Sequence, residues 1–154
     1  MFGGNNNHTR TFALLRGGLA IHNPLSDSSV AGGAYGTIGF IGTSDGEDRW
    51  VVSCYHVLCR KGEDFPKGAN EPIFHPVSQI RPSPVGFVTD ERVDRALDCA
   101  AARVINPALS IGQLLGAPLL EGPIEAQVGM RVIKSGAETG VTEGRITRVV
   151  SDQI

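Results

Sequence analysis

Cysteine is scarce in this chain, with 3 among 154 residues, namely Cys54, Cys59 and Cys99. The odd number argues against a disulfide framework, so we expect three reduced thiols that fill the places of small buried hydrophobic side chains. Cys54, His56 and Cys59 lie close enough in sequence to raise the question of zinc. Because no paired C-x2-C or H-x3-H spacing is present, the sequence predicts no metal site and no cofactor.

Long apolar runs and clusters of positive charge are also missing. No stretch approaches the roughly 20 apolar residues of a membrane span. The formal net charge is −2 and there is no basic run, which argues against a nucleic-acid partner. Residues 1–8 lack the charged and apolar regions of a signal peptide. We therefore expect a cytoplasmic protein that binds neither membranes nor nucleic acid.

A long pattern with the 3.6-residue period of helices is absent too. Instead, the chain holds 20 glycines and 9 prolines, and its short apolar runs are bounded by glycine, proline, asparagine or aspartate. These features predict an all-β sandwich or barrel with many turns. We expect strands within 14–21, 35–41, 49–55, 71–76, 84–90, 128–134 and 144–150. Residues 98–104 suit a strand or a helix because they are rich in alanine.

One stretch has a chemical character of its own, residues 49–58 (R-W-V-V-S-C-Y-H-V-L). It predicts a strand that stops near His56 and gives way to a brief helical turn at 57–60. A histidine at a strand end is held by rigid backbone yet can face a cleft, as a general base must. The alternative is a core histidine whose ring nitrogen bonds a backbone carbonyl. We expect that structural role for His75, which is flanked by Phe74 and Pro76.

Four stretches occur in an order that carries a family resemblance. They are 36–39 (G-T-I-G), 53–58 (S-C-Y-H-V-L), 98–104 (D-C-A-A-A-R-V) and 132–144 (V-I-K-S-G-A-E-T-G-V-T-E-G). Together they resemble a bacterial branch of the chymotrypsin/trypsin-like serine proteases. In that branch the histidine sits in an S-x-x-H-V-L-like segment and the aspartate opens a D-x-A-x-A strand. A V-x-K-x-G-x-x-T-G-x-T-x-G hairpin begins the second barrel.

The resemblance implies a chymotrypsin-like double β-barrel, here with one complete six-stranded barrel and the first hairpin of the second. Residues 1–13 would be a flexible N-terminus and 14–108 the first barrel. Residues 109–123 would connect the domains, and 124–154 would be the incomplete start of the second barrel. His56 would be the catalytic base and Asp98 its orienting partner. Asp94 is an alternative to Asp98 for this role, because the sequence around it at 93–97 resembles the sequence around Asp98.

The serine nucleophile of the family has no counterpart in this sequence. Its G-D-S-G segment is absent, and residues 43–46 (T-S-D-G) hold similar residue types in the wrong order before His56. Ser135 occupies a hairpin position that is not the nucleophile's. Residues 137–138 (A-E) also stand where the family often has Arg-Thr, which leaves the role of those two positions open. Without a serine, His56 and Asp98 have nothing to activate.

Three functional hypotheses follow. The first is the N-terminal part of a trypsin-like serine endopeptidase, inactive alone, whose partners are a polypeptide substrate or a complementary C-terminal protease segment. The second is a non-catalytic, protease-derived binding module, whose exposed strand edges would take up a peptide or form homo-oligomers. The third is a thiol enzyme that uses Cys54 or Cys59 with His56.

Overall fold

The described part of the protein consists mostly of β-strands and loops with little helix, so the all-β prediction is confirmed. A computed structural model describes residues 14–26, 35–43, 46–62, 64–75, 84–117 and 122–150. The expected flexible N-terminus at 1–13 lies outside the described residues. The strands are β1 (Leu15–Gly17), β2 (Ala20–Ile21), β3 (Gly36–Thr37), β4 (Phe40–Gly42), β5 (Trp50–Ser53), β6 (Asn70–Phe74), β7 (Pro84–Asp94), β8 (Cys99–Val104), β9 (Ser110–Leu114), β10 (Arg131–Gly136) and β11 (Gly140–Arg145).

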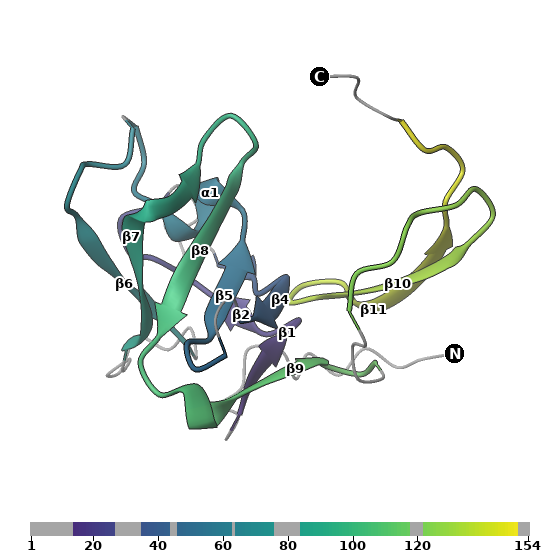
Figure 1. Cartoon of the computed structure of the whole chain (residues 1–154), viewed down its shortest axis with the longest axis horizontal. Coiled ribbons are helices and arrows are strands. Elements are labelled where there is room, and N and C mark those ends of the chain that lie inside the picture. The colour runs from purple at the N-terminus through teal and green to yellow at the C-terminus, as the bar shows by residue number, and fades with distance from the viewer. Residues whose placement is uncertain are drawn as a thin grey trace.

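The main element is a five-stranded antiparallel sheet with the order β4-β5-β8-β7-β6 (Figure 1). β6 is an edge strand, as Pro72 within it requires, because proline has no N–H to donate to a second neighbour. The alanine-rich stretch forms β8 and not a helix. Ala100 and Ala102 are buried and Cys99, Ala101 and Arg103 are not, which is the two-residue alternation of a strand.

The hydrophobic core lies between this sheet and the segment 15–21 at the start of the chain. Leu19 and Ile21 from that segment pack in one cluster with Val51 of β5, Ile73 of β6 and Val88 of β7, all five fully buried. The strands of the main sheet therefore present one face to the core. This fixes their register, because a slip of one residue would turn the apolar side chains outward.

Three two-stranded sheets complete the described structure: β1 with β9, β2 with β3, and β10 with β11. Among the described residues the strands do not join into one continuous closed barrel. Two expected strands are each divided, 14–21 at Gly18, whose φ of +88° suits glycine, and 35–41 at Ile38 and Gly39. The expected connection at 109–123 contains β9, which pairs in parallel with β1.

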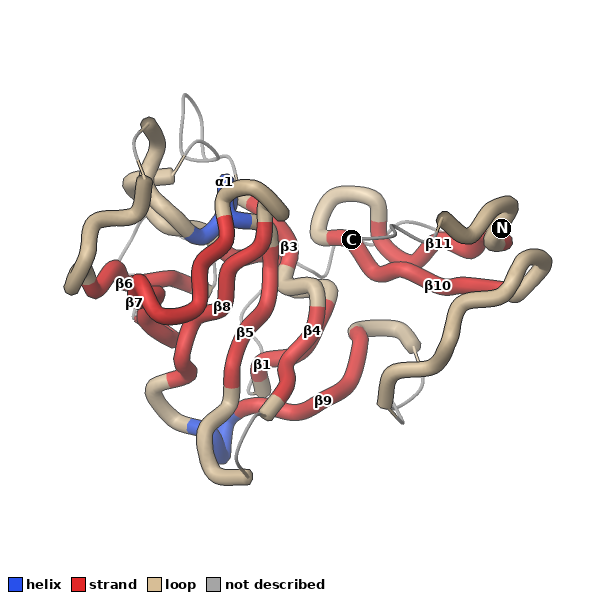
Figure 2. The backbone as a smooth tube through the Cα atoms, turned by 45° about the horizontal axis from the view of Figure 1, so that its top comes forward, coloured by secondary structure: helices blue, strands red, loops and turns tan. Residues whose placement is uncertain are grey.

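The β10–β11 hairpin lies to one side of the main sheet (Figure 2). Its strands run over 131–136 and 140–145, so the expected ranges of 128–134 and 144–150 were wrong. The strands are displaced because the turn is short. It covers only 137–139, between the paired Gly136 and Gly140, whereas the expected strands left 135–143 for it. The Ala137 N–H donates to Thr37 Oγ1 at 2.9 Å and fastens this turn to the sheets.

The described residues include two short helices, α1 (Tyr55–Leu58) and a 3-10 helix at Pro107–Leu109. No helix in this part of the chain has the length and apolar character to cross a membrane.

Candidate active site

His56 is presented to solvent by a helix whose other residues are buried. β5 ends at Ser53, and α1 begins two residues later, earlier than the expected turn at 57–60. Tyr55, Val57 and Leu58 are 7%, 5% and 0% exposed, so they hold the single turn against the core. The His56 side chain, in contrast, is 55% exposed. The alternative of a core histidine is therefore wrong for His56.

Asp98 lies at the end of a tight turn between β7 and β8. Its N–H donates to the carbonyl oxygen of Arg95 at 3.2 Å, and its φ of 49° is the only positive value at a non-glycine residue in the described part of the chain. Aspartate tolerates this left-handed conformation better than most residues. Asp94 opens the same turn, where its Oδ1 accepts from the Leu97 N–H at 2.9 Å. The rival aspartate thus shapes the turn that presents Asp98.

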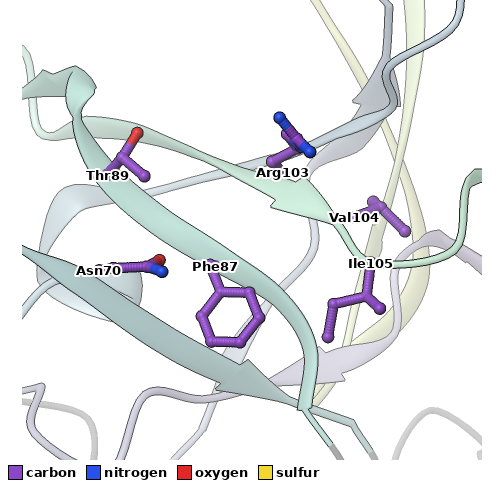
Figure 3. Close-up of a pocket in the computed structure, with 6 residues that line it drawn as sticks. All are labelled: Asn70, Phe87, Thr89, Arg103, Val104 and Ile105. Atoms are coloured by element: carbon purple, nitrogen blue, oxygen red, sulfur yellow. The ribbon is translucent and has the colours of Figure 1, made fainter.

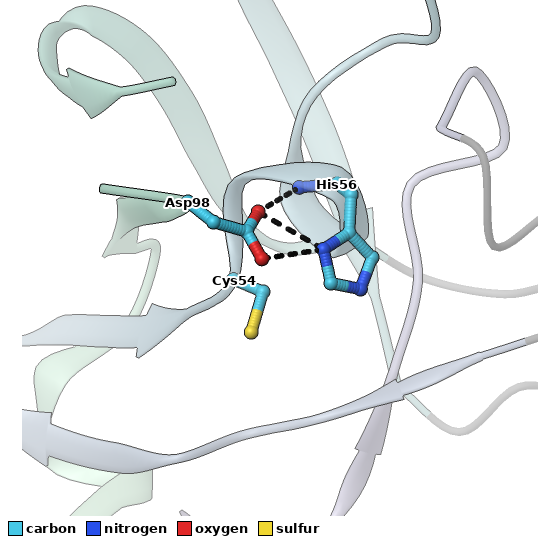
Figure 4. A group of neighbouring side chains, drawn as sticks. All are labelled: Cys54, His56 and Asp98. Carbon is cyan, nitrogen blue, oxygen red and sulfur yellow. Dashed lines mark hydrogen bonds and ion pairs between the residues drawn. The ribbon is translucent and has the colours of Figure 1, made fainter. Parts of the chain in front are cut away.

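The imidazole of His56 and the carboxylate of Asp98 meet although 42 residues separate them (Figure 4). His56 Nδ1 lies 2.8 Å from Asp98 Oδ2 and 2.9 Å from Oδ1. The His56 backbone N–H also donates to Oδ1, at 3.1 Å. Cys54 at the helix N-cap makes no side-chain cap hydrogen bond, and Asp98, from the turn before β8, accepts the hydrogen bond of this helical N–H instead.

The hydrogen bonds to Asp98 determine which ring nitrogen of the neutral His56 imidazole carries the proton. An ionised carboxylate only accepts hydrogen bonds, so Nδ1 must be the donor. The neutral ring then carries its lone pair on Nε2, which points away from Asp98 in Figure 4. A solvent-facing Nε2 with a free lone pair is the atom that a general base needs.

Hydrogen bonds from His56 hold the pKa of the Asp98 carboxyl below its ordinary value of 3.8. The largest contribution is the His56 backbone N–H, followed by the hydrogen bond and charge of the imidazole and by the Cys54 thiol. Partial loss of solvation acts in the opposite direction and is outweighed. Asp98 is therefore ionised at neutral pH, as an orienting carboxylate must be.

The three cysteines are all free, and they differ in environment. Cys59 is fully buried, as expected, and burial raises the pKa of its thiol to about 12. Cys54 and Cys99 are exposed, so the expectation of buried positions was wrong for these two. Burial of the sulfur and then the charge of Asp98 raise the pKa of Cys54. A raised pKa disfavours the thiolate, and this argues against a thiol enzyme.

Two of the surface depressions are lined entirely by described residues. One of about 240 Å³ contains the His56–Asp98 pair and is lined by Tyr55, His56, Arg60, Gly62, Arg95 and Asp98. A larger one of about 400 Å³ lies over β6, β7 and β8 (Figure 3) and is lined by Asn70, Phe87, Thr89, Arg103, Val104 and Ile105. The first is the candidate site, because, unlike the second, it combines an acid–base pair with access from solvent.

A buried polar network behind the site has no signal in the sequence. Glu71 of β6 is 3% exposed and accepts from Asn23 Nδ2 at 2.6 Å and from Arg60 Nε. Asn23 also donates to the Leu58 carbonyl oxygen at 2.8 Å, at the C-terminal end of α1. The network links β6, the end of the first segment and the helix that carries His56. From these residues the sequence predicted only a strand at 71–76, which contains Glu71.

The described serines are all engaged away from His56. Ser26, Ser53, Ser110 and Ser135 each donate a hydroxyl proton to a backbone carbonyl oxygen, respectively of Asn23, Thr37, Pro107 and Leu115. No serine in this part of the chain therefore faces Nε2 as a nucleophile would. Ser44, in the T-S-D-G stretch, lies outside the described residues.

Comparison with known proteins gives no relative from which a role could be transferred. No protein-family model matches the sequence, and no curated protein matches it significantly.

Proposed function

We propose that this chain carries the general base and the orienting carboxylate of a trypsin-like serine endopeptidase. The observation that carries the proposal is the contact of 2.8 Å between His56 Nδ1 and Asp98 Oδ2. The pair joins two sequence motifs of the family at the ends of neighbouring strands, β5 and β8. The serine would come from a segment outside the 154 residues, so this chain alone would not hydrolyse peptides.

The order of strand pairing supports a chymotrypsin-like barrel. β2 pairs with β3, and β3 leads into β4, with Ile38 and Gly39 between them hydrogen bonded to Leu19 and Val52. From β4 the pairing continues through β5, β8 and β7 to β6. His22, next to β2, then bridges to Phe74 at the end of β6. The described strands form separate sheets, but the order of these contacts around six segments is the order that a six-stranded barrel would have.

The chemistry of each residue follows from its position. With a serine placed at Nε2, His56 takes the hydroxyl proton during attack on the peptide carbonyl and later gives it to the leaving amine. Asp98 keeps the Nδ1 proton in place and stabilises the imidazolium that forms. The exposed side chain of His56 leaves room for the serine and the substrate.

The test is to express the chain with the segment that its coding sequence encodes beyond residue 154, or with a separate serine-bearing chain, and to add a fluorophosphonate. We expect one serine outside the 154 residues to be labelled, and His56→Ala to abolish labelling. Asp98→Asn should lower turnover of a peptide substrate by roughly 10⁴-fold. Asp94→Asn is the matched control and should label normally.

Labelling that persists in His56→Ala would refute the assignment of the base. A reading frame that stops at residue 154, together with no labelled partner chain, would refute the endopeptidase.

A second function is favoured by the surface of the β10–β11 hairpin. Val132, Ile133 and Val141 are 41%, 45% and 43% exposed, and neither hairpin strand pairs with a third strand among the described residues. Such edges take up an additional strand, so a protease-derived module could bind a peptide or a second copy of itself. Light scattering over a range of concentrations tests self-association, and a monomer at every concentration would count against it.

A further inference from the structure

The Cys54 thiol joins the His56–Asp98 pair in a three-residue cluster. One ligand atom from each of Cys54, His56 and Asp98 lies within 4.8 Å of the others, and all three residues are exposed. Figure 4 shows the sulfur on the same side of the helix start as the carboxylate. The sequence predicts no metal site, and Cys59, which lies near Cys54 and His56 in sequence, is fully buried and takes no part in this cluster.

The cluster combines a sulfur, a nitrogen and an oxygen ligand, which are the three ligand types of zinc sites. Tetrahedral zinc holds such atoms about 3.4–3.7 Å from one another. Nδ1 and Oδ2 are now 2.8 Å apart, and the widest separation in the cluster is within 4.8 Å. Shifts of about 1 Å in exposed side chains would meet the zinc geometry. The strand ends that carry the residues would not need to move.

The charges balance as well. A Cys54 thiolate and the Asp98 carboxylate together offset the two positive charges of the ion, and the neutral imidazole adds a third ligand. Three protein ligands leave a fourth position open to water, as in sites that exchange their metal or bind a substrate.

We propose that Cys54, His56 and Asp98 form a Zn²⁺ site. When zinc is bound, the hydrogen bond between the His56 imidazole and the Asp98 carboxylate is lost. On binding, the thiol releases its proton to solvent as the Zn–S bond forms. The imidazole proton moves from Nδ1 to Nε2, because Nδ1 now coordinates the ion. Nε2 then holds a proton and cannot act as a base, so zinc would switch off any reaction that uses His56. The site needs no serine and goes beyond the proposed function.

Cobalt titration of the freshly reduced chain tests the proposal, because Co²⁺ replaces Zn²⁺ and reports its ligands by absorption. We expect a sulfur-to-cobalt charge-transfer band together with the visible bands of tetrahedral Co²⁺, and loss of both on adding zinc. Cys54→Ser should abolish the charge-transfer band and lower the affinity for zinc that calorimetry measures, because it removes the only sulfur ligand of the site. Cys99→Ser removes the other exposed thiol and should change neither measurement.

His56→Ala is the second variant and should also weaken zinc binding, while fluorescence of the single tryptophan checks that each variant is folded. The absence of a charge-transfer band, or equal zinc affinity for Cys54→Ser and Cys99→Ser, would overturn the proposal. These readouts do not depend on peptidase activity, so failure of the metal site and failure of the proposed function would be told apart.

Discussion

Replacing Gly36 with alanine should destabilise the protein and disturb the helix that carries His56. A Cβ at this position would overlap both methyl carbons of Val57 and lie 2.9 Å from its Cβ. Val57 follows His56 in α1 and is 5% exposed, and the helix cannot retreat because the core lies behind it. Overpacking of this kind costs about 1–3 kcal/mol. Alanine also restricts the unfolded chain, which stabilises the folded protein by about 0.4–1 kcal/mol. We therefore expect the free energy of unfolding to fall by about 1–2 kcal/mol.

Denaturation in guanidinium, followed by the fluorescence of Trp50, measures this loss. Gly144→Ala is the matched control, since its Cβ would lie 3.6 Å from Val132, an ordinary contact in another strand. That variant should be neutral or slightly more stable. Adding Val57→Ala to Gly36→Ala removes the two methyl carbons and should recover about 0.5–2 kcal/mol in a double-mutant cycle. If Gly36→Ala costs no more than Gly144→Ala, or if Val57→Ala brings no recovery, the packing argument is wrong.

Three further predictions concern the surroundings of the site. Glu71→Ala removes one acceptor of the Asn23 amide and the partner of the half-exposed Arg60, and should cost about 1–3 kcal/mol of unfolding free energy; its effect combined with Asn23→Ala should be clearly less than additive. Because the folded-state pKa of Asp98 lies below 3.8, the stability it contributes is present above that pH and is lost as the pH falls through the folded pKa. The stability difference between the wild-type protein and Asp98→Asn should therefore shrink on acidification, and a constant difference would contradict the pairing. Thr37→Val removes the acceptor of the Ala137 N–H, so hydrogen exchange at that amide should accelerate, and an unchanged rate would mean that other contacts hold the hairpin turn.

The contact between His56 and Asp98 was expected from the order and spacing of motifs that resemble a protease family, and local strand signals supported only the His56 side of it. The run 50–52 (W-V-V) favours a strand before the histidine, whereas the three consecutive alanines at 100–102 after Asp98 suit a strand or a helix. The two strands pair directly, so residues just beyond their ends are brought together. The local pattern left residues 98–104 open between strand and helix, and their pairing with β5 is what makes them a strand.

Other features depend on contacts that no local pattern encodes. Glu71 sits in an edge strand, where a charged residue normally faces solvent, and only the fold reveals that Asn23 and Arg60 enclose it. The Cys54 thiol lies by the carboxylate because Asp98 adopts a left-handed φ at the end of its turn, which spacing does not predict. The hairpin strands were displaced because Gly136 and Gly140 both pair within the ladder and do not belong to the turn.

The protonation of the His56 ring is the most direct test of the central claim that Asp98 orients His56 as a base. Long-range ¹H–¹⁵N correlation spectra of the labelled 154-residue chain, recorded where the imidazole is neutral, identify which ring nitrogen carries the proton. The account predicts the proton on Nδ1 in the wild-type protein, and a shift toward Nε2 in Asp98→Asn. A wild-type ring protonated mainly on Nε2, or a proton distribution that Asp98→Asn leaves unchanged, would contradict it.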